Sequence, residues 1–317
     1  MAHWFEEKEE VKTSAPILLT LRLVQLLPIC IVNVIVFAVT FFFCVFSKRA
    51  RNSALQFQRQ LKQYTGGKIP KRISAYKTIL SFGLCVVERI SGWLGKVKAS
   101  DVSYCDDDIE DFWQNLSAGR GAVLIGSHLG NIDLLRSLST FSRAGVAKEI
   151  PVTVIMEIGS VENFNQTLKK INPKYELTAL DPKDVGPDAI AQLQEKIQHG
   201  EIVVVTGDRT SSRNQERFLK IPFLGREAKF PYGIFLITAL LETHQIYFVF
   251  ALRNKTVMLN PKNRVYMQKS HVVFTDCPRS EREGKIKELA GEFVGLLEKF
   301  AVQFPHQWYN FFDFWLE

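Results

Sequence analysis

Short apolar runs and helical patterns alternate along the C-terminal part of the chain. Runs typical of buried strands lie at 121–127, 151–156, 175–179, 202–206 and 246–252. Segments with helical spacing of apolar residues accompany them, at 131–141, 160–171, 186–199, 231–243 and 281–303. A β-rich stretch at 256–276 follows the last of these strands. The alternation predicts an α/β fold with βαβ units, in which a mostly parallel sheet carries helices on both faces.

Two further helices are expected ahead of the first strand. Residues 50–64 and 73–95 both carry apolar residues at helical spacing, and the stripe of the second is broad and ends at Trp93. The stripe consists of Ile73, Tyr76, Ile79, Leu80, Leu84, Val87 and Ile90. Such a helix either packs on the domain that follows or contacts a membrane, and we favour the packed helix.

An uncharged segment near the N-terminus, at 23–47, is longer than any other apolar run. Its 24 apolar-rich residues would extend about 36 Å as a helix, and the hydrocarbon core of a bilayer is about 30 Å thick. The run is too long for the apolar part of a cleaved signal peptide, and no small-residue cleavage site follows it. We therefore expect a membrane anchor. Pro28 and Asn33 leave two forms open, a tilted spanning helix and a hairpin-like interfacial segment.

The charges around this segment predict its orientation. Acidic residues precede it, at Glu6, Glu7, Glu9 and Glu10. Basic residues follow it, at Lys48, Arg49, Arg51, Arg59, Lys62, Lys68, Lys71 and Arg72. They contribute much of the basic excess behind the net charge of +7, and they suit anionic lipid headgroups. The bias predicts that the chain after residue 47 lies on the cytoplasmic side of the membrane. No zinc-finger spacing or RNP-like pattern supports nucleic acid as a partner.

These patterns divide the chain into four parts. They are a short segment at 1–22, the anchor at 23–47, a basic amphipathic helical region at 48–100 and one α/β domain at 101–317. No linker interrupts the chain beyond the anchor. The five cysteines are scattered and form no C-x-x-C pair, which predicts free thiols in a reducing compartment rather than a zinc site or a disulfide framework.

Candidate chemistry begins where the first strand of the α/β domain ends. Residues 126–133 read GSHLGNID, so His128 and Asp133 stand five positions apart just after a buried run. Open α/β sheets place their ligand crevices at this end of their strands. A neutral imidazole there can take a proton from a hydroxyl, and a nearby carboxylate can fix its tautomer and stabilise the imidazolium. The other interpretation of such a histidine is a hydrogen-bonded core residue.

A second polar turn, Gly207-Asp208-Arg209, follows the strand at 202–206. Parallel strands present their carboxyl ends together, so Asp208 and Arg209 are expected at the same sheet edge as His128. The guanidinium of Arg209 would suit a phosphate or a carboxylate. The alternative is a surface salt bridge between the two residues of the turn.

The segment 218–226 is apolar but contains Pro222 and Gly225, which exclude a regular central strand. It would form a flap or wall beside the site, or an ordinary connection between strands. No G-x-S-x-G surrounds Ser127, and the sequence contains neither a P-loop nor a G-x-G-x-x-G. Serine hydrolysis, nucleotide-dependent transfer and hydride transfer therefore lack support.

Together these features resemble the lysophospholipid acyltransferase superfamily, in particular its lipid A late acyltransferases of the lauroyl/myristoyl type. The resemblance rests on His128-x4-Asp133, on Gly207-Asp208-Arg209 and on the stretch IPFLGREAKFPYGIFLI. The anchor, the N-terminal HWFEE and the C-terminal FPHQWYNFFDFW extend it over nearly the whole chain. The Gly-Asp-Arg turn and Glu157 stand where lipid A enzymes usually carry an Asp-Gln-Asp-type turn and an arginine, so the acceptor lipid stays open.

The resemblance implies a membrane-associated acyltransferase of the cell inner membrane that requires no metal and no cofactor. It would move a fatty acyl group from a thioester of acyl carrier protein or coenzyme A to a hydroxyl of a lipid acceptor. His128 would be the general base, and Asp133 would orient it. The substrate-binding residues would be Gly130, Asn131, Asp208 and Arg209. Backbone N–H groups of the first two would stabilise the oxyanion, and Arg209 would hold a phosphate.

Two other functions are compatible with the sequence. A non-catalytic, membrane-tethered protein of the same fold would bind lipid and would not depend on His128. An acyl thioesterase would use the same histidine and aspartate to activate water, and it would release free fatty acid without an acceptor.

Overall fold

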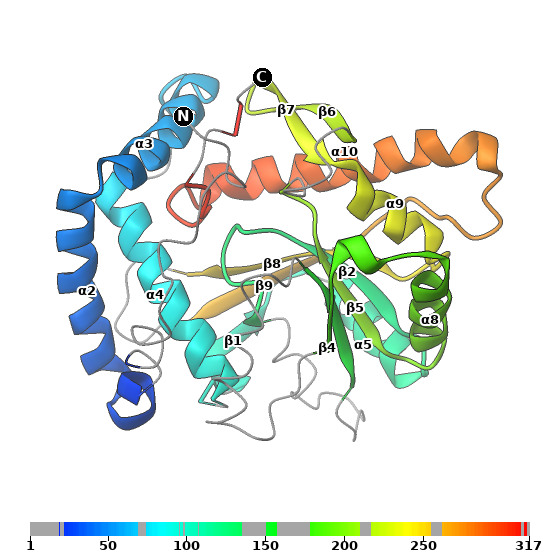
Figure 1. Ribbon diagram of the computed structural model, residues 1–317, viewed down its shortest axis with the longest axis horizontal. Helices are drawn as coiled ribbons and strands as arrows, with labels where there is room; N and C mark the ends of the chain where they lie inside the picture. The colour runs from blue at the N-terminus through cyan, green and yellow to red at the C-terminus, as the bar shows by residue number, and fades with distance from the viewer. Residues whose placement is uncertain are drawn as a thin grey trace.

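The apolar runs of the sequence form neighbouring strands of one seven-stranded sheet (Figure 1). The computed structural model describes residues 19, 22–68, 74–94, 96–97, 99–106, 108–134, 150–156, 178–209, 217–254, 262–311 and 314–315. The strand order in the sheet is β1-β9-β8-β2-β5-β3-β4. In chain order the strands are β1 (Val102–Tyr104), β2 (Ala122–Gly126), β3 (Val152–Ile155), β4 (Thr178–Leu180), β5 (Ile202–Thr206), β8 (Ile246–Arg253) and β9 (Asn263–Lys269).

The strands β8, β2, β5, β3 and β4 run parallel to one another. β9 is antiparallel to β8, and the short β1 is parallel to β9 at the edge of the sheet. The sheet is therefore mostly parallel, as predicted. Each predicted strand has a counterpart, although residues 175–177 of the third one lie outside the described residues.

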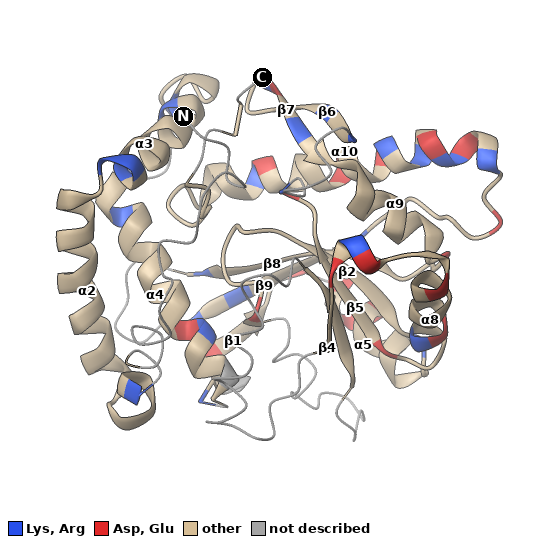
Figure 2. Cartoon of the chain, in the orientation of Figure 1, with Lys and Arg blue, Asp and Glu red and all other residues tan. Residues whose placement is uncertain are grey.

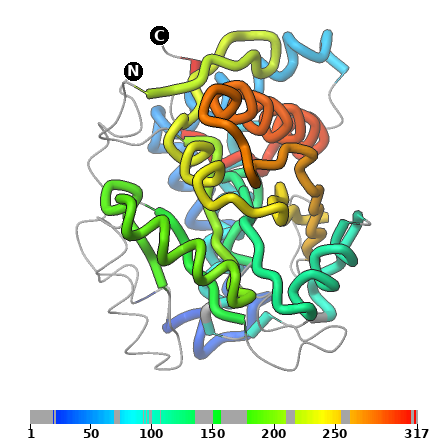
Figure 3. Tube along the Cα trace, turned by 90° about the vertical axis from the view of Figure 1, so that its right-hand side faces the viewer, coloured from blue at the N-terminus to red at the C-terminus, as the bar shows by residue number. Residues whose placement is uncertain are grey.

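Helices cover both faces of the sheet, which confirms the predicted fold class. Alternate residues of β2 point to opposite sides: Val123 and Ile125 belong to the core under α8, α9 and α10, and Leu124 belongs to the core under α5. Figure 3 shows α8 and α5 on opposite sides of the sheet. Burial on both faces explains why these strands read as continuous apolar runs. The helices are α5 (Asp108–Ser117), α8 (Pro187–Gln198), α9 (Tyr232–Leu240) and α10 (Arg279–Gln303).

The helices predicted at 186–199, 231–243 and 281–303 are confirmed as α8, α9 and α10. The helix predicted at 131–141 lies outside the described residues from 135 onward, and the one at 160–171 lies wholly outside them, as does Glu157. The sequence did not predict α5 or the three-residue strand β1. The buried stripe of α5 consists of Ile109, Phe112, Trp113 and Leu116.

The N-terminal apolar segment folds as α2 (Ile29–Phe46), which is followed by α3 (Lys48–Tyr64) and α4 (Ala75–Trp93). Among the described helices, α2 is the one that is long and apolar enough to cross a membrane. It is shorter than the predicted anchor because Pro28 stands at its N-terminus, where the proline ring keeps the preceding residue out of helical conformation. Its 18 residues extend about 27 Å.

α2 lies alongside α4 and packs against it (Figure 1). Val32 and Thr40 are buried, and the hydroxyl of Tyr76 on α4 donates to the carbonyl oxygen of Phe37 at 3.1 Å. Elsewhere α2 exposes large apolar side chains: Ile31, Val34, Ile35, Val39, Phe41, Phe42, Phe43, Val45 and Phe46. Figure 2 shows no charged residue along α2, whereas α3 carries several basic ones. The structure thus combines an exposed apolar surface with a basic helix next to it.

The segment 218–226 lies outside the main sheet, as Pro222 and Gly225 predicted. It forms the first strand and the turn of a separate antiparallel hairpin, built from β6 (Phe218–Phe223) and β7 (Arg226–Pro231). The ring of Phe223 lies 5.2 Å from that of Trp308, measured between centroids. The hairpin therefore packs behind the C-terminal segment that follows α10.

Candidate active site

Two strand ends bring His128 and Asp208 together. β2 and β5 are parallel neighbours, with Gly126 opposite Thr206, so the residues that follow these strands meet at one sheet edge. His128 Nδ1 lies 2.8 Å from Asp208 Oδ1. The backbone N–H of His128 donates to the other carboxylate oxygen, Oδ2, also at 2.8 Å. One carboxylate therefore holds both the ring and the backbone of the histidine.

The C-terminal segment adds a third donor to the same carboxylate. Trp308 Nε1 donates to Asp208 Oδ2 at 3.2 Å. The backbone N–H of Tyr309 donates to the carbonyl oxygen of His128 at 3.1 Å, and Trp308 pairs with Leu129 in a short antiparallel bridge. Only 1% of the Asp208 side chain is exposed, compared with 26% of the His128 side chain. The carboxylate is fixed from three sides, and the imidazole stays accessible to a substrate.

The surroundings of His128 keep its imidazole neutral. Burial lowers the pKa of His128 and the charge of Arg209 lowers it further, whereas Asp208 acts in the opposite direction without reversing the shift. Burial raises the pKa of Asp208, but the imidazole of His128 and the Arg209 guanidinium bring it below its usual value. A neutral imidazole beside an ionised carboxylate donates its Nδ1–H to that carboxylate. Its Nε2 then remains as a proton acceptor.

Asp133, the expected partner of His128, makes a different contact. Its Oδ2 accepts a hydrogen bond from Nε of Arg89 on α4, and the two side chains are 20% and 30% exposed. Within the described part of the chain, no hydrogen bond or ion pair joins Asp133 to His128. The short spacing in the sequence suggested that Asp133 orients the histidine, but the sheet order places Asp208 at Nδ1 instead.

Gly130 and Asn131 also differ from expectation. The N–H of Gly130 donates to the Gln307 carbonyl oxygen and the N–H of Asn131 donates to the Ala251 carbonyl oxygen, both at 2.8 Å. Both donors are therefore engaged within the protein, and their expected role at an oxyanion stays a prediction. Gly130 has a φ of 84°, and a Cβ atom there would collide with the carbonyl oxygen of Ala251. The glycine is therefore required by the backbone.

Arg209 lies at the same sheet edge, where the strand pattern predicted it. Its Nη2 donates to the Tyr309 carbonyl oxygen at 3.0 Å, and the residue is partly buried. A surface salt bridge between Asp208 and Arg209, the alternative from sequence, does not fit a carboxylate that is almost completely buried. Arg209 instead places a positive charge near His128.

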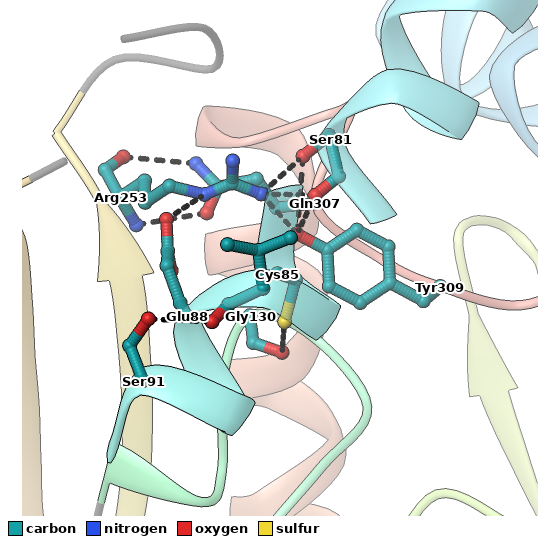
Figure 4. A network of polar contacts seen from close by, with 9 residues as sticks. Ser81, Cys85, Glu88, Ser91, Gly130, Arg253, Gln307 and Tyr309 are labelled. Atoms are coloured by element: carbon teal, nitrogen blue, oxygen red, sulfur yellow. Dashed lines mark hydrogen bonds and ion pairs between the residues drawn. The ribbon is translucent and has the colours of Figure 1, made fainter. Parts of the chain in front are cut away.

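A buried polar network behind this loop was not predicted from the sequence (Figure 4). Nε of Arg253, at the end of β8, lies 3.4 Å from Oε1 of Glu88 on α4. Nη2 of Arg253 donates to the Tyr309 hydroxyl at 2.7 Å, and the Gln307 side chain bonds the backbone N–H and carbonyl of Arg253 at 2.8 and 2.9 Å. The network joins α4, the sheet and the C-terminal segment.

Cys85 connects α4 to the loop that carries His128. Its Sγ donates to the Gly130 carbonyl oxygen at 3.7 Å, and burial raises the pKa of the thiol to about 12, so the thiol keeps its proton. The sequence did contain signals for these residues. Glu88 and Arg89 interrupt an apolar stripe, and Arg253 ends an apolar strand; charged residues are rarely buried without a partner.

The arrangement as a whole suits proton abstraction from a hydroxyl group. It offers an accessible neutral imidazole, a buried carboxylate that can stabilise the imidazolium, and a cation nearby that favours an anionic substrate. Among the described residues, no group of three or more His, Cys, Asp or Glu side chains is placed to hold a metal ion.

Comparison with known protein families gives a match over nearly the whole chain. The model of the family described as bacterial lipid A biosynthesis acyltransferase matches residues 17–317. This range includes α2, the His128 loop, the Asp208 turn and the C-terminal segment. Among curated proteins, no relative matches the sequence. The match shows that the chain belongs to the family of bacterial lipid A biosynthesis acyltransferases.

Proposed function

We propose that this acyltransferase moves a fatty acyl group from an acyl thioester to a hydroxyl of a lipid acceptor, with His128 as general base and Asp208 as its orienting partner. The observation that carries the proposal is the 2.8 Å contact between His128 Nδ1 and Asp208 Oδ1, combined with an imidazole that stays accessible. A base held by a buried carboxylate is the arrangement that activates hydroxyl nucleophiles in many enzymes.

The contact between His128 and Asp208 supports a general-base reaction. Nε2 of His128 takes the proton of the acceptor hydroxyl while its oxygen forms a bond with the thioester carbon. The carbonyl oxygen becomes an oxyanion, and the ionised Asp208 stabilises the imidazolium. The carbon–sulfur bond then breaks, the thiolate takes the proton from the imidazolium, and the ester product leaves. General-base assistance of this kind contributes typically about 10²–10⁴-fold.

Arg209 supports the use of anionic substrates. The acyl donor is a thioester of acyl carrier protein or of coenzyme A, and either carries a phosphopantetheine phosphate. We assign to Arg209 a contact with an anionic group of the donor or the acceptor, since a guanidinium suits phosphate oxygens. Its partial exposure and its place beside His128 are consistent with this role.

The site would work at the cytoplasmic surface of the inner membrane. The exposed apolar side chains of α2 suit the acyl region of a bilayer, and the basic α3 suits anionic headgroups. Attachment by these two elements would hold the catalytic domain beside its lipid acceptor.

The direct test replaces His128 in the full-length protein. His128→Ala and His128→Gln should abolish formation of acylated lipid, measured by mass spectrometry with purified enzyme, acyl thioester and a lipid A precursor. Expression and membrane fractionation should stay unchanged. If a His128 variant kept more than about a tenth of wild-type turnover, this would contradict a general base that contributes about 10²–10⁴-fold.

Release of free fatty acid by the wild type without transfer would identify a thioesterase. Lipid binding without turnover would identify a non-catalytic protein.

A further inference from the structure

Two consecutive charged residues of α4, Glu88 and Arg89, make different contacts near the active site. Glu88 is buried and meets Arg253 in the network of Figure 4. Arg89 lies at the rim, with 30% of its side chain exposed, and meets Asp133. Contacts of Ser81, Cys85 and Glu88 fix α4 against the sheet and the C-terminal segment. Arg89 is therefore presented from a helix whose position is set by buried contacts.

The imidazole of His128 leaves no position for a second carboxylate. Nδ1 of a neutral imidazole carries one hydrogen, and Asp208 accepts it. Nε2 must remain free if it is to accept a proton from the substrate. Asp133 has its own partner, Arg89, and within the part of the chain described by the structure it makes no hydrogen bond or ion pair with His128. The aspartate of the His128-x4-Asp133 spacing must therefore act through another group.

We propose that Asp133 positions Arg89, and that the Arg89 guanidinium binds a phosphate of a substrate beside His128. The ion pair uses the Nε edge of the guanidinium, and the exposed part of the side chain retains donors for a ligand. A guanidinium offers five donors in a rigid plane, so one edge can be held by a carboxylate while another meets phosphate oxygens. The inference rests on the acyl transfer proposed above and adds a binding residue to it.

Two further observations support this assignment. Arg89 and Arg209, which come from different elements, both lower the pKa of His128, so both charges act at the position of the imidazole and favour an anionic group there. Asp133 occupies the Nε edge of the Arg89 guanidinium and fixes its orientation in advance, so this side chain loses less conformational freedom when a ligand binds. A phosphate arrives with either substrate: in the phosphopantetheine arm of the donor, or on the sugar headgroup of a lipid A precursor.

The test compares Arg89→Gln, Asp133→Asn, the double variant and Asp208→Asn in the full-length enzyme. Arg89→Gln should raise KM for one substrate about 10- to 100-fold, the loss expected for a hydrogen bond to a charged group, with a small effect on kcat. Asp133→Asn should raise KM for the same substrate by less. The double variant should match Arg89→Gln alone, because Asp133 acts only through Arg89. Asp208→Asn should instead lower kcat.

Two modified substrates identify the source of the phosphate. An acyl-pantetheine donor lacks the phosphate, and a dephosphorylated lipid A precursor lacks those of the acceptor. The KM penalty of Arg89→Gln should vanish with whichever substrate has lost the phosphate that Arg89 binds. If the penalty persisted with both, Arg89 would not be a phosphate ligand and the inference would be overturned.

The outcomes separate this inference from the proposed function. If Asp133→Asn lowered kcat as strongly as Asp208→Asn with KM unchanged, Asp133 would orient the base and the inference would fail while acyl transfer stood. The inference would also fail if the double variant lost the sum of both single effects. Retained turnover in His128→Ala would instead reject the proposed mechanism itself. Arg89→Lys, which keeps the charge, should recover KM only in part.

Discussion

Individual charges around His128 set the pH range in which it can accept a proton. Its pKa lies below the ordinary value of 6.5 because of burial and of the Arg209 charge. The neutral imidazole is the active form, so activity should fall as the pH drops through this lowered pKa. Arg209→Gln removes a positive charge and should raise the pKa of His128. The acid limb of the kcat/KM profile should therefore move to higher pH.

The matched variant at this position is Arg209→Lys. It keeps the charge, so the acid limb should stay near its wild-type position, but it loses the planar fork, so turnover should still be clearly impaired. Profiles of kcat/KM against pH for the three proteins measure both effects. An unshifted limb in Arg209→Gln would mean that Arg209 does not act on His128.

Asp208 should matter more for the rate than for binding. Asp208→Asn keeps the shape of the side chain, but an amide cannot stabilise the imidazolium and can favour the wrong tautomer. We expect kcat to fall about 10³–10⁴-fold, as for the aspartate of a serine-protease triad, with KM nearly unchanged. Asp181→Asn is the control, since Asp181 is also buried but caps the short turn before α8. A kcat of Asp208→Asn within tenfold of wild type would contradict the assignment.

The sequence could place His128 but not its partner. A histidine at the end of a buried strand is recognisable from the residues around it. The choice between Asp133 and Asp208 depends on which strand lies next to β2, and no local pattern states that β5 does. For the same reason the sequence could not predict the role of Trp308 within the aromatic C-terminal run. In the structure its indole N–H donates to Asp208.

Among the elements, α4 is tied to the sheet by one buried ion pair. The side chains of Arg253 and Glu88 are 2% and 6% exposed. Arg253→Met would leave the Glu88 carboxylate without its charged partner, which typically costs about 3–5 kcal/mol. We therefore expect the Tm to fall by several degrees in detergent. Lys220→Met is the control, because it removes an ion pair whose side chains are 57% and 61% exposed, and such pairs contribute little. Equal shifts of Tm in both variants would mean that the buried ion pair stabilises the fold no more than the exposed one.

Element prediction succeeded where burial leaves a long, regular pattern. β2, β5 and β8 are buried on both faces and read as unbroken apolar runs. β1 spans three residues, and α5 is short and begins with acidic residues. Neither segment therefore contains an apolar pattern long enough to predict a strand or a helix. Pro28 already indicated that the helix would begin after it. The predicted anchor nevertheless began at residue 23, because it was defined by the uncharged, apolar composition of the run.

For the molecule as a whole, the packing of α2 restricts how it can meet a membrane. α2 lies against α4, and α4 carries Glu88 and Arg89 toward the sheet and the active site. A bilayer that surrounded α2 along its whole length would also surround α4 and would draw charged groups into hydrocarbon, which is costly. We therefore favour the interfacial form of the anchor over the spanning one. The apolar pattern alone could not distinguish them, because it does not say which element covers one side of the helix.

This arrangement predicts which changes to α2 should weaken membrane binding. Deleting residues 1–47 would release much of it but would also uncover Val87 and Ile90, which pack against the α2 region, so substitutions on the exposed surface are a cleaner test. Val39 and Phe42 are 60% and 59% exposed, and Val39→Lys with Phe42→Lys would place two charges where the acyl chains should lie.

The double variant should stay with vesicles of anionic lipid at low salt through the basic residues of α3. It should dissociate in 1 M salt, where the screening length falls to about 3 Å, whereas the wild type should remain bound. Gln192→Lys with Gln198→Lys adds the same charge on exposed positions of α8 and should behave like the wild type. Sedimentation with vesicles at both salt concentrations measures the outcome. If the α2 variant stayed bound in high salt as firmly as the wild type, the exposed side of α2 would not be the surface that enters the bilayer.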